Sequence, residues 1–165
     1  LANPNITKLW WAVDRAVKTA VREKTTTHTH GLSFTYQGGM LYITLPSSRQ
    51  LSYVLPRMGE NRFGGESVTY MGTDFTKHWS RIESYGPKFV ENIVQAISRD
   101  ILCHAMEQLK EYRVVAHVHD ECIVECPPST TVQEISDRMA TCPTWASGLI
   151  LRADGYECPG YYMKD

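Results

Sequence analysis

The chain has 165 residues, of which 42% are apolar and 21% charged. This length supports one substantial hydrophobic core, so we expect one compact domain or a piece of a larger protein. The 17 Lys and Arg against 18 Asp and Glu give a net charge of −1. Charge alone therefore does not indicate a polyanion such as nucleic acid as the partner.

The charges are unevenly distributed along the chain. Residues 1–58 hold seven Lys and Arg and two Asp and Glu, a local charge of +5, which leaves −6 for residues 59–165. A basic front can meet phosphate and an acidic back can hold divalent cations, although solvated surface charge explains most such divisions.

The five cysteines form an odd set without a secretory signal, so we expect reduced thiols and a cytoplasmic location. No apolar run approaches the roughly 18 residues of a membrane span. The first residue is Leu1, which suggests that the chain was cut from something longer.

The first half of the sequence predicts a helix followed by a small antiparallel meander. Asn3 and Pro4 start an amphipathic pattern that ends near Lys24, where a β-branched stretch interrupts it. Alternation then predicts strands at 32–36, 40–45 and 50–55. We expect a loop at 56–66 and a short strand at 68–71.

The second half begins with the longest periodic segment, which predicts a helix over 87–112 with an apolar stripe through Ile93, Ile97 and Ile101. Two short apolar runs, 114–118 and 122–125, predict a hairpin. Thr131 and Glu134 fit a capping box for a helix reaching residue 139, and 149–157 alternates like a final strand. The whole pattern predicts an α+β fold.

The most specific local feature is His119-Asp120-Glu121, which lies where the hairpin should turn. Hairpin turns favour Asn-Gly or Asp-Gly, so turn chemistry does not explain this choice. Mg²⁺ binds through one or two carboxylates together with substrate phosphates, which makes Asp120 and Glu121 candidate metal ligands. An ordinary exposed polar turn is the alternative.

The long helix places Lys88, Asn92 and Gln95 at spacings of four and three, so they share one face. A cation and two amides suit phosphate or the base edges of a minor groove. A solvated helix face gives the same pattern.

Several segments of the chain form a recognisable set. The segment at 84–100 reads Ser-Tyr-Gly-Pro-Lys-Phe-Val-Glu-Asn-Ile-Val-Gln-Ala-Ile-Ser-Arg-Asp, and His-Val-His-Asp-Glu follows at 117–121. The others are Ala-Asn-Pro-Asn-Ile and Leu-Trp-Trp at the front, Leu-Pro-Ser-Ser-Arg at 45–49, Trp-Ala-Ser-Gly-Leu at 145–149 and the ending Gly-Tyr-Tyr-Met-Lys-Asp. Together these segments resemble the C-terminal part of family A DNA polymerases, most closely the phage and prophage branch. Their order and spacing make the resemblance strong, and it covers nearly the whole chain.

The resemblance implies a role for each matching residue. Asp120 is similar to the palm carboxylate that ligates a catalytic divalent ion, Glu121 to its partner acid, and His119 to the residue that supports the primer end. Lys88, Asn92 and Gln95 are similar to the helix along the primer-template minor groove. Older cellular members carry Arg and Asn where this chain has Pro87 and Glu91.

The resemblance also implies what the chain lacks. Family A enzymes need an earlier palm aspartate and a fingers helix that grips the incoming triphosphate, and both precede the first matched segment. We therefore expect residues 1–85 to be derived from the fingers and residues 86–165 to be the C-terminal palm part, with the hairpin and the tail strand packed on the long helix. The intact parent would use two Mg²⁺ ions, primer-template DNA and dNTP, while the isolated chain should be inactive and self-associate through uncovered apolar surface.

Two other readings of the sequence stay open. One is a small metal-dependent nuclease or phosphatase using the acidic turn, and the other is a non-catalytic DNA-binding module. His28 and His30 together with His117 and His119 suggest a zinc cluster, although alternating histidines on a strand edge are more often exposed polar positions.

Overall fold

The computed structural model describes residues 2–61 and 63–158, and it is α+β as the sequence predicts. The described chain forms two compact units, Leu1–Gln95 and Ala96–Asp165. Helix α2 runs from Gly86 to Gln108 and contributes to both. No helix in the described ranges is long and apolar enough to span a membrane.

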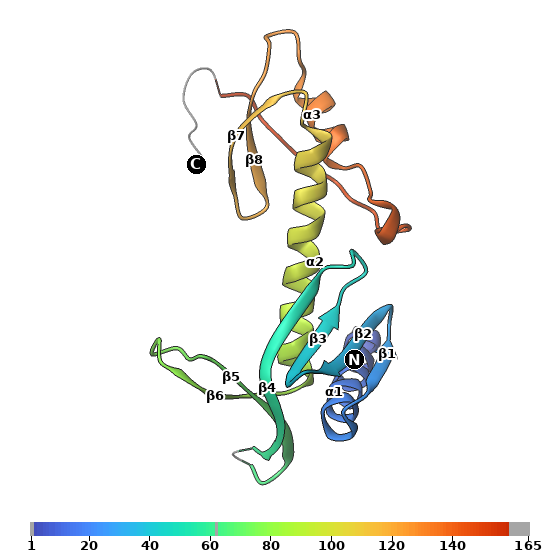
Figure 1. The fold of residues 1–165 in the computed structure, drawn as a ribbon. Coiled ribbons are helices and arrows are strands. Elements are labelled where there is room, and N and C mark those ends of the chain that lie inside the picture. Colours follow the sequence, from blue (N-terminus) through green and yellow to red (C-terminus); the bar gives the residue numbers. More distant parts are fainter. Residues whose placement is uncertain (1, 62, 159–165) are drawn as a thin grey trace. The chain divides into compact units, whose positions relative to one another are not determined.

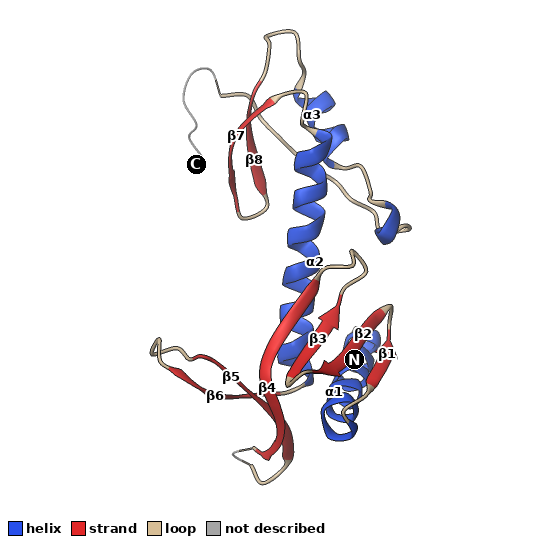
Figure 2. Ribbon diagram, viewed as in Figure 1, coloured by secondary structure: helices blue, strands red, loops and turns tan. Residues whose placement is uncertain are grey.

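The N-terminal unit holds one helix, a six-stranded sheet and the start of α2 (Figures 1 and 2). Each strand pairs antiparallel with the next along the chain, in the order β1 to β6. The elements before α2 are α1 (Pro4–Glu23), β1 (Thr26–Thr29), β2 (Leu32–Gln37), β3 (Met40–Thr44), β4 (Gln50–Glu60), β5 (Glu66–Thr73) and β6 (Trp79–Ser84).

The core of this unit lies between α1 and one face of the sheet. The apolar stripe of α1 buries Val13 and Val17 completely, and α1 contacts β1, β2, β4 and β5. Phe34 of β2 and Ile43 of β3 are paired across the ladder and fully buried. Because side chains alternate along a strand, this face also includes Leu41 and its cross-strand partner on β4, Tyr53.

Sequence patterns miss two strands of the sheet and shorten two others. β1 lies in the Thr-rich stretch that we expected only to end the helix, and β6 was not expected. β5 is longer than the predicted 68–71. β4 continues where we predicted a loop, because a bulge between Val54 and Arg57 accommodates Pro56, and Gly59 then pairs with Ser67 of β5. A bulge is where a strand tolerates a residue without an N–H, and Leu55 takes a positive φ of 46° there.

The C-terminal unit contains the second half of α2, β7 (Arg113–Val118), β8 (Glu121–Glu125), α3 (Val132–Met139) and the 3₁₀ turn η1 (Thr144–Ala146). Leu102 and Ala105 on this half of α2 are buried, and so is Leu109 directly after the end of the helix. Of the expected capping box, the N-cap half is confirmed, since the Thr131 side chain accepts a hydrogen bond from the Glu134 backbone N at 3.2 Å. The Glu134 carboxylate accepts a hydrogen bond from the Tyr112 hydroxyl.

Three expectations for this unit are wrong. Helix α2 ends at Gln108 instead of 112, and residues 149–157 form no strand. The hairpin buries its apolar side chains only in part, since Val115 and Val118 are 46% and 45% exposed while Val114, Ile123 and Val124 are half-buried. Alternation alone does not make a strand where no partner strand is within reach, and the matched ending at 160–165 lies outside the described residues.

Candidate functional site

The acidic turn lies at the tip of the β7–β8 hairpin. Val118 pairs with Glu121, so the turn is only His119 and Asp120, and Glu121 already belongs to β8. At the open end of the hairpin, Arg113 and Glu125 pair across the strands at 3.0 Å. The two-residue connection fixes where the tip residues leave the ladder.

The backbone at the tip is unusual for its residue type. His119 has a φ of +52°, at the first turn position, where two-residue hairpin turns favour Gly or Asn. A non-glycine residue in this region costs about 1–2 kcal/mol relative to ordinary backbone. Folding alone therefore does not account for a histidine at this position.

The two acids of the tip differ in their environment. Asp120 is exposed at the turn, whereas Glu121 is half-buried at the start of β8. The described part of the chain contains no cluster of three His, Cys, Asp or Glu side chains that would hold a metal by itself. A carboxylate pair fits Mg²⁺ only as part of a shell completed by phosphate, water or ligands from another segment.

The three predicted helix residues lie on the first half of α2, in the N-terminal unit. Lys88 is exposed and pairs with Glu91 at 2.9 Å, an interaction that raises the Lys88 pKa, and Gln95 is exposed. Asn92 is half-buried and donates a hydrogen bond from Nδ2 to the Tyr53 hydroxyl at 3.0 Å. The helix face is therefore anchored to the sheet at its middle residue.

Tyr53 is a neighbour that sequence reasoning missed, because 39 residues separate it from Asn92. Its ring makes edge contacts with Tyr70 and Phe89 at centroid distances of 4.9 and 5.2 Å. Burial raises the pKa of Tyr53 to about 12, against the opposing effect of the Asn92 hydrogen bond. The phenol therefore stays protonated at neutral pH and can hold the Asn92 side chain in one position.

The start of α2 is fixed by a second contact that the sequence did not reveal. The buried Asp14 of α1 accepts a hydrogen bond from the Gly86 backbone N at 3.0 Å and pairs with Lys18 at 2.8 Å. A Cβ on Gly86 would lie 2.4 Å from the Trp10 carbonyl oxygen, so only glycine allows this approach. The sequence feature that could have indicated this contact is the acid Asp14, which lies next to the apolar stripe of its helix.

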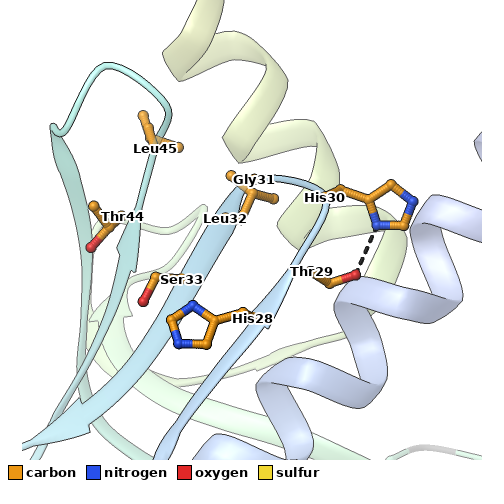
Figure 3. A pocket seen from close by; sticks show the side chains of 8 residues that line it. All are labelled: His28, Thr29, His30, Gly31, Leu32, Ser33, Thr44 and Leu45. Atoms are coloured by element: carbon orange, nitrogen blue, oxygen red, sulfur yellow. Dashed lines mark hydrogen bonds between the residues drawn. The ribbon is translucent and has the colours of Figure 1, made fainter. Parts of the chain in front are cut away.

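The histidines fall into two separate sets. His28 and His30 line a hollow of about 370 Å³ at the β1–β2 turn, where Thr29 Oγ1 and His30 Nδ1 are 2.8 Å apart (Figure 3). His117 and His119 belong to the hairpin of the other unit. The helix residues and the acidic turn likewise belong to different units.

The chain is similar to a phage protein that is named as a DNA polymerase. It is 41% identical over 169 aligned residues to a DNA polymerase of Bacillus phage SP02. No family model matches the chain, and neither does any solved structure. The similarity covers 99% of this chain and 26% of the phage protein, so the chain spans about a quarter of the length of the polymerase that it resembles.

Proposed function

We propose that the chain is the C-terminal palm and partial fingers segment of a family A DNA polymerase of the phage or prophage type, working in the bacterial cytoplasm. The carrying observation is similarity to the phage polymerase over 99% of the chain, with Asp120 exposed at a short, defined turn. The parent would add dNTP to the 3′-hydroxyl of a primer paired to its template.

The acidic turn would hold the metal in this reaction. Bound Mg²⁺ would activate the primer 3′-hydroxyl and neutralise the leaving pyrophosphate. Asp120 and Glu121 would hold it, with the remaining protein ligand supplied by an aspartate outside this chain. His119, one residue before, would support the primer end.

The first half of α2 would bind the primer-template duplex. Lys88 offers a charged donor to phosphate, while Asn92 and Gln95 offer amides to the minor groove. The hydrogen bond from Asn92 to Tyr53 supports this role, because an amide held in place loses less entropy when it binds.

A segment exchange tests the proposal. This chain replaces the corresponding quarter of the SP02 polymerase, and primer extension in Mg²⁺ is measured beside the isolated chain. We expect the chimera to extend primers and the isolated chain to extend none. In the chimera, Asp120→Asn should lower the rate at least about a thousandfold, because several kcal/mol of metal stabilisation are lost, with modest loss of DNA affinity.

The matched control is Asp154→Asn, which neutralises an exposed acid of the same unit outside the proposed site. This variant should keep the activity of the chimera. A folded chimera that extends no primer, or equal activity of the two variants, would contradict the proposal. Extension by the isolated chain would contradict the inactive-fragment part of it, and an Asp120-dependent nuclease or phosphatase activity of the isolated chain would favour the hydrolase instead.

A further inference from the structure

The loop between β5 and β6 is ordered by one carboxylate. Asp74 Oδ1 accepts hydrogen bonds from the Thr76 and His78 backbone N atoms at 2.9 and 3.0 Å and from Thr76 Oγ1 at 2.6 Å. Its Oδ2 accepts from the Ser80 hydroxyl at 3.0 Å, and these bonds lower the Asp74 pKa. The loop therefore has a defined conformation although it lies on the surface.

This ordered loop displays two aromatic side chains. Phe75, directly after Asp74, is 98% exposed, and Trp79 at the start of β6 is 62% exposed. The loop lies at the end of its hairpin away from α1 (Figure 1). Burying a Phe side chain is worth about 1.5–3 kcal/mol, so an ordered loop that displays one favours a bound partner.

Lys77 places a positive charge beside the aromatic side chains. Asp74 is the only acid between residues 74 and 81, and its carboxylate oxygens are engaged within the loop. Lys77 is exposed, and Arg81 is held on the sheet by hydrogen bonds to the Leu55 carbonyl and Thr69 Oγ1 at 3.1 and 3.2 Å. An exposed aromatic ring can stack on a base, and a cation beside the ring can bind the adjacent phosphate of the same strand.

We propose that the β5–β6 loop binds single-stranded DNA, with the Phe75 ring stacked on an unpaired base and Lys77 on the adjacent phosphate. This proposal rests on the proposed function for its choice of DNA as the ligand. Base stacking fits a projecting loop because every unpaired base offers a flat face. Trp79 adds a second aromatic surface two residues from Lys77.

The test measures binding of the 165-residue chain to a fluorescein-labelled oligothymidylate by anisotropy at low salt. We expect Phe75→Ala and Phe75→Leu each to weaken binding by about 5- to 100-fold, since both lose the stacked ring. Phe75→Trp should bind at least as well as the unchanged chain. Lys77→Gln should weaken binding and lower the slope of log K against log salt by about 0.7.

The control is Tyr156→Leu, which changes an aromatic side chain that is 58% exposed in the C-terminal unit and lies near the acids Asp154 and Glu157 in the sequence, and it should leave binding unchanged. Circular dichroism checks the fold of each variant, and because the Phe75 side chain is exposed, the fold should not depend on it.

Three outcomes would overturn the proposal: no binding of the oligonucleotide, full binding by Phe75→Leu, or stronger binding of a blunt duplex than of the single strand. Full binding by Phe75→Leu would indicate that the site recognises apolar surface, as a protein partner offers. If the loop does not bind single-stranded DNA, the anisotropy experiment fails while the chimera still extends primers. If the proposed polymerase function is wrong, the chimera extends no primer, and the anisotropy result does not depend on that outcome.

Discussion

His119 has a backbone conformation that is unfavourable for a non-glycine residue, and the proposed function offers a reason for a histidine at this position. The proposed function gives its imidazole a role at the primer end, while the φ of +52° favours glycine. Replacing His119 by glycine should therefore relieve backbone strain and slow primer extension at the same time.

We therefore predict that His119→Gly is more stable than His119→Ala by about 1 kcal/mol, because glycine relieves the left-handed strain that alanine keeps. Urea denaturation of the two variants measures this difference. Both variants lose the imidazole, so both should slow primer extension in the chimera. Equal stability of the glycine and alanine variants would show that the turn holds no such strain.

The residues of the site illustrate what a sequence can reveal. The tip position of His119 and Asp120 followed from two short apolar runs, because a hairpin is a local structure. The Asn92 contact with Tyr53 was not predictable from spacing, since the partners meet only after β4 has been placed in the sheet.

At the scale of elements, the contact between α1 and α2 decides where the long helix begins. The Gly86 backbone N has its acceptor in Asp14, which is 8% exposed and lies on a helix that ends 63 residues earlier in the chain. Removing that acceptor leaves a buried donor without a partner.

We predict that Asp14→Ala lowers the free energy of unfolding by about 2 kcal/mol, within the range for an unsatisfied buried polar group. Asp14→Asn keeps an acceptor oxygen and loses only the ion pair with Lys18, so it should cost clearly less. Thermal and urea unfolding of both variants make the comparison. An asparagine variant as unstable as the alanine variant would assign the effect to charge instead of the hydrogen bond.

Some elements are predictable from the periodicity of their own sequence, whereas others form only because a neighbouring strand pairs with them. The stripe of α1 and the N-cap of α3 are local patterns, and both helices form where expected. β6 is an edge strand, and its sequence Trp-Ser-Arg-Ile-Glu-Ser does not alternate apolar and polar residues. Residues 149–157 show the converse, since they alternate well but have no strand beside them.

At the scale of the whole molecule, the chain leaves much apolar surface uncovered. In the C-terminal unit, Ile150 is 82% exposed and Leu149 is 47% exposed, in addition to Val115 and Val118 of the hairpin. The phage relative is about four times as long, and its remaining segments offer a source of cover for such a surface.

We predict that the isolated chain self-associates as its concentration rises, and that Ile150→Ser reduces this tendency. Size-exclusion chromatography with light scattering measures the molar mass of the chain over a hundredfold range of concentration. This range corresponds to roughly 3 kcal/mol in association free energy. The control is Phe63→Ser in the N-terminal unit, which should associate like the unchanged chain. A strict monomer at every concentration would contradict the prediction.

The division of the molecule into units depends on contacts that the sequence does not display. We expected a boundary between residues 85 and 86, at the start of the long helix. The compact units divide the chain between Gln95 and Ala96, because the first turns of α2 pack with the sheet through Phe89 and Tyr53. The assignment of residues 1–85 to the fingers and of 86–165 to the palm stays a prediction.

The hydrogen bond between Asp14 and Gly86 also bears on how the chain tolerates change. All six strands of the large sheet lie between these two residues in the sequence, so the chain enters and leaves the meander at segments that are in contact with each other. Insertions or deletions in its hairpin turns would alter the outer part of the sheet and leave this closure, and the start of α2, in register. Relatives of this chain can therefore differ greatly in the length of the meander while keeping α1 and α2 joined in the same way.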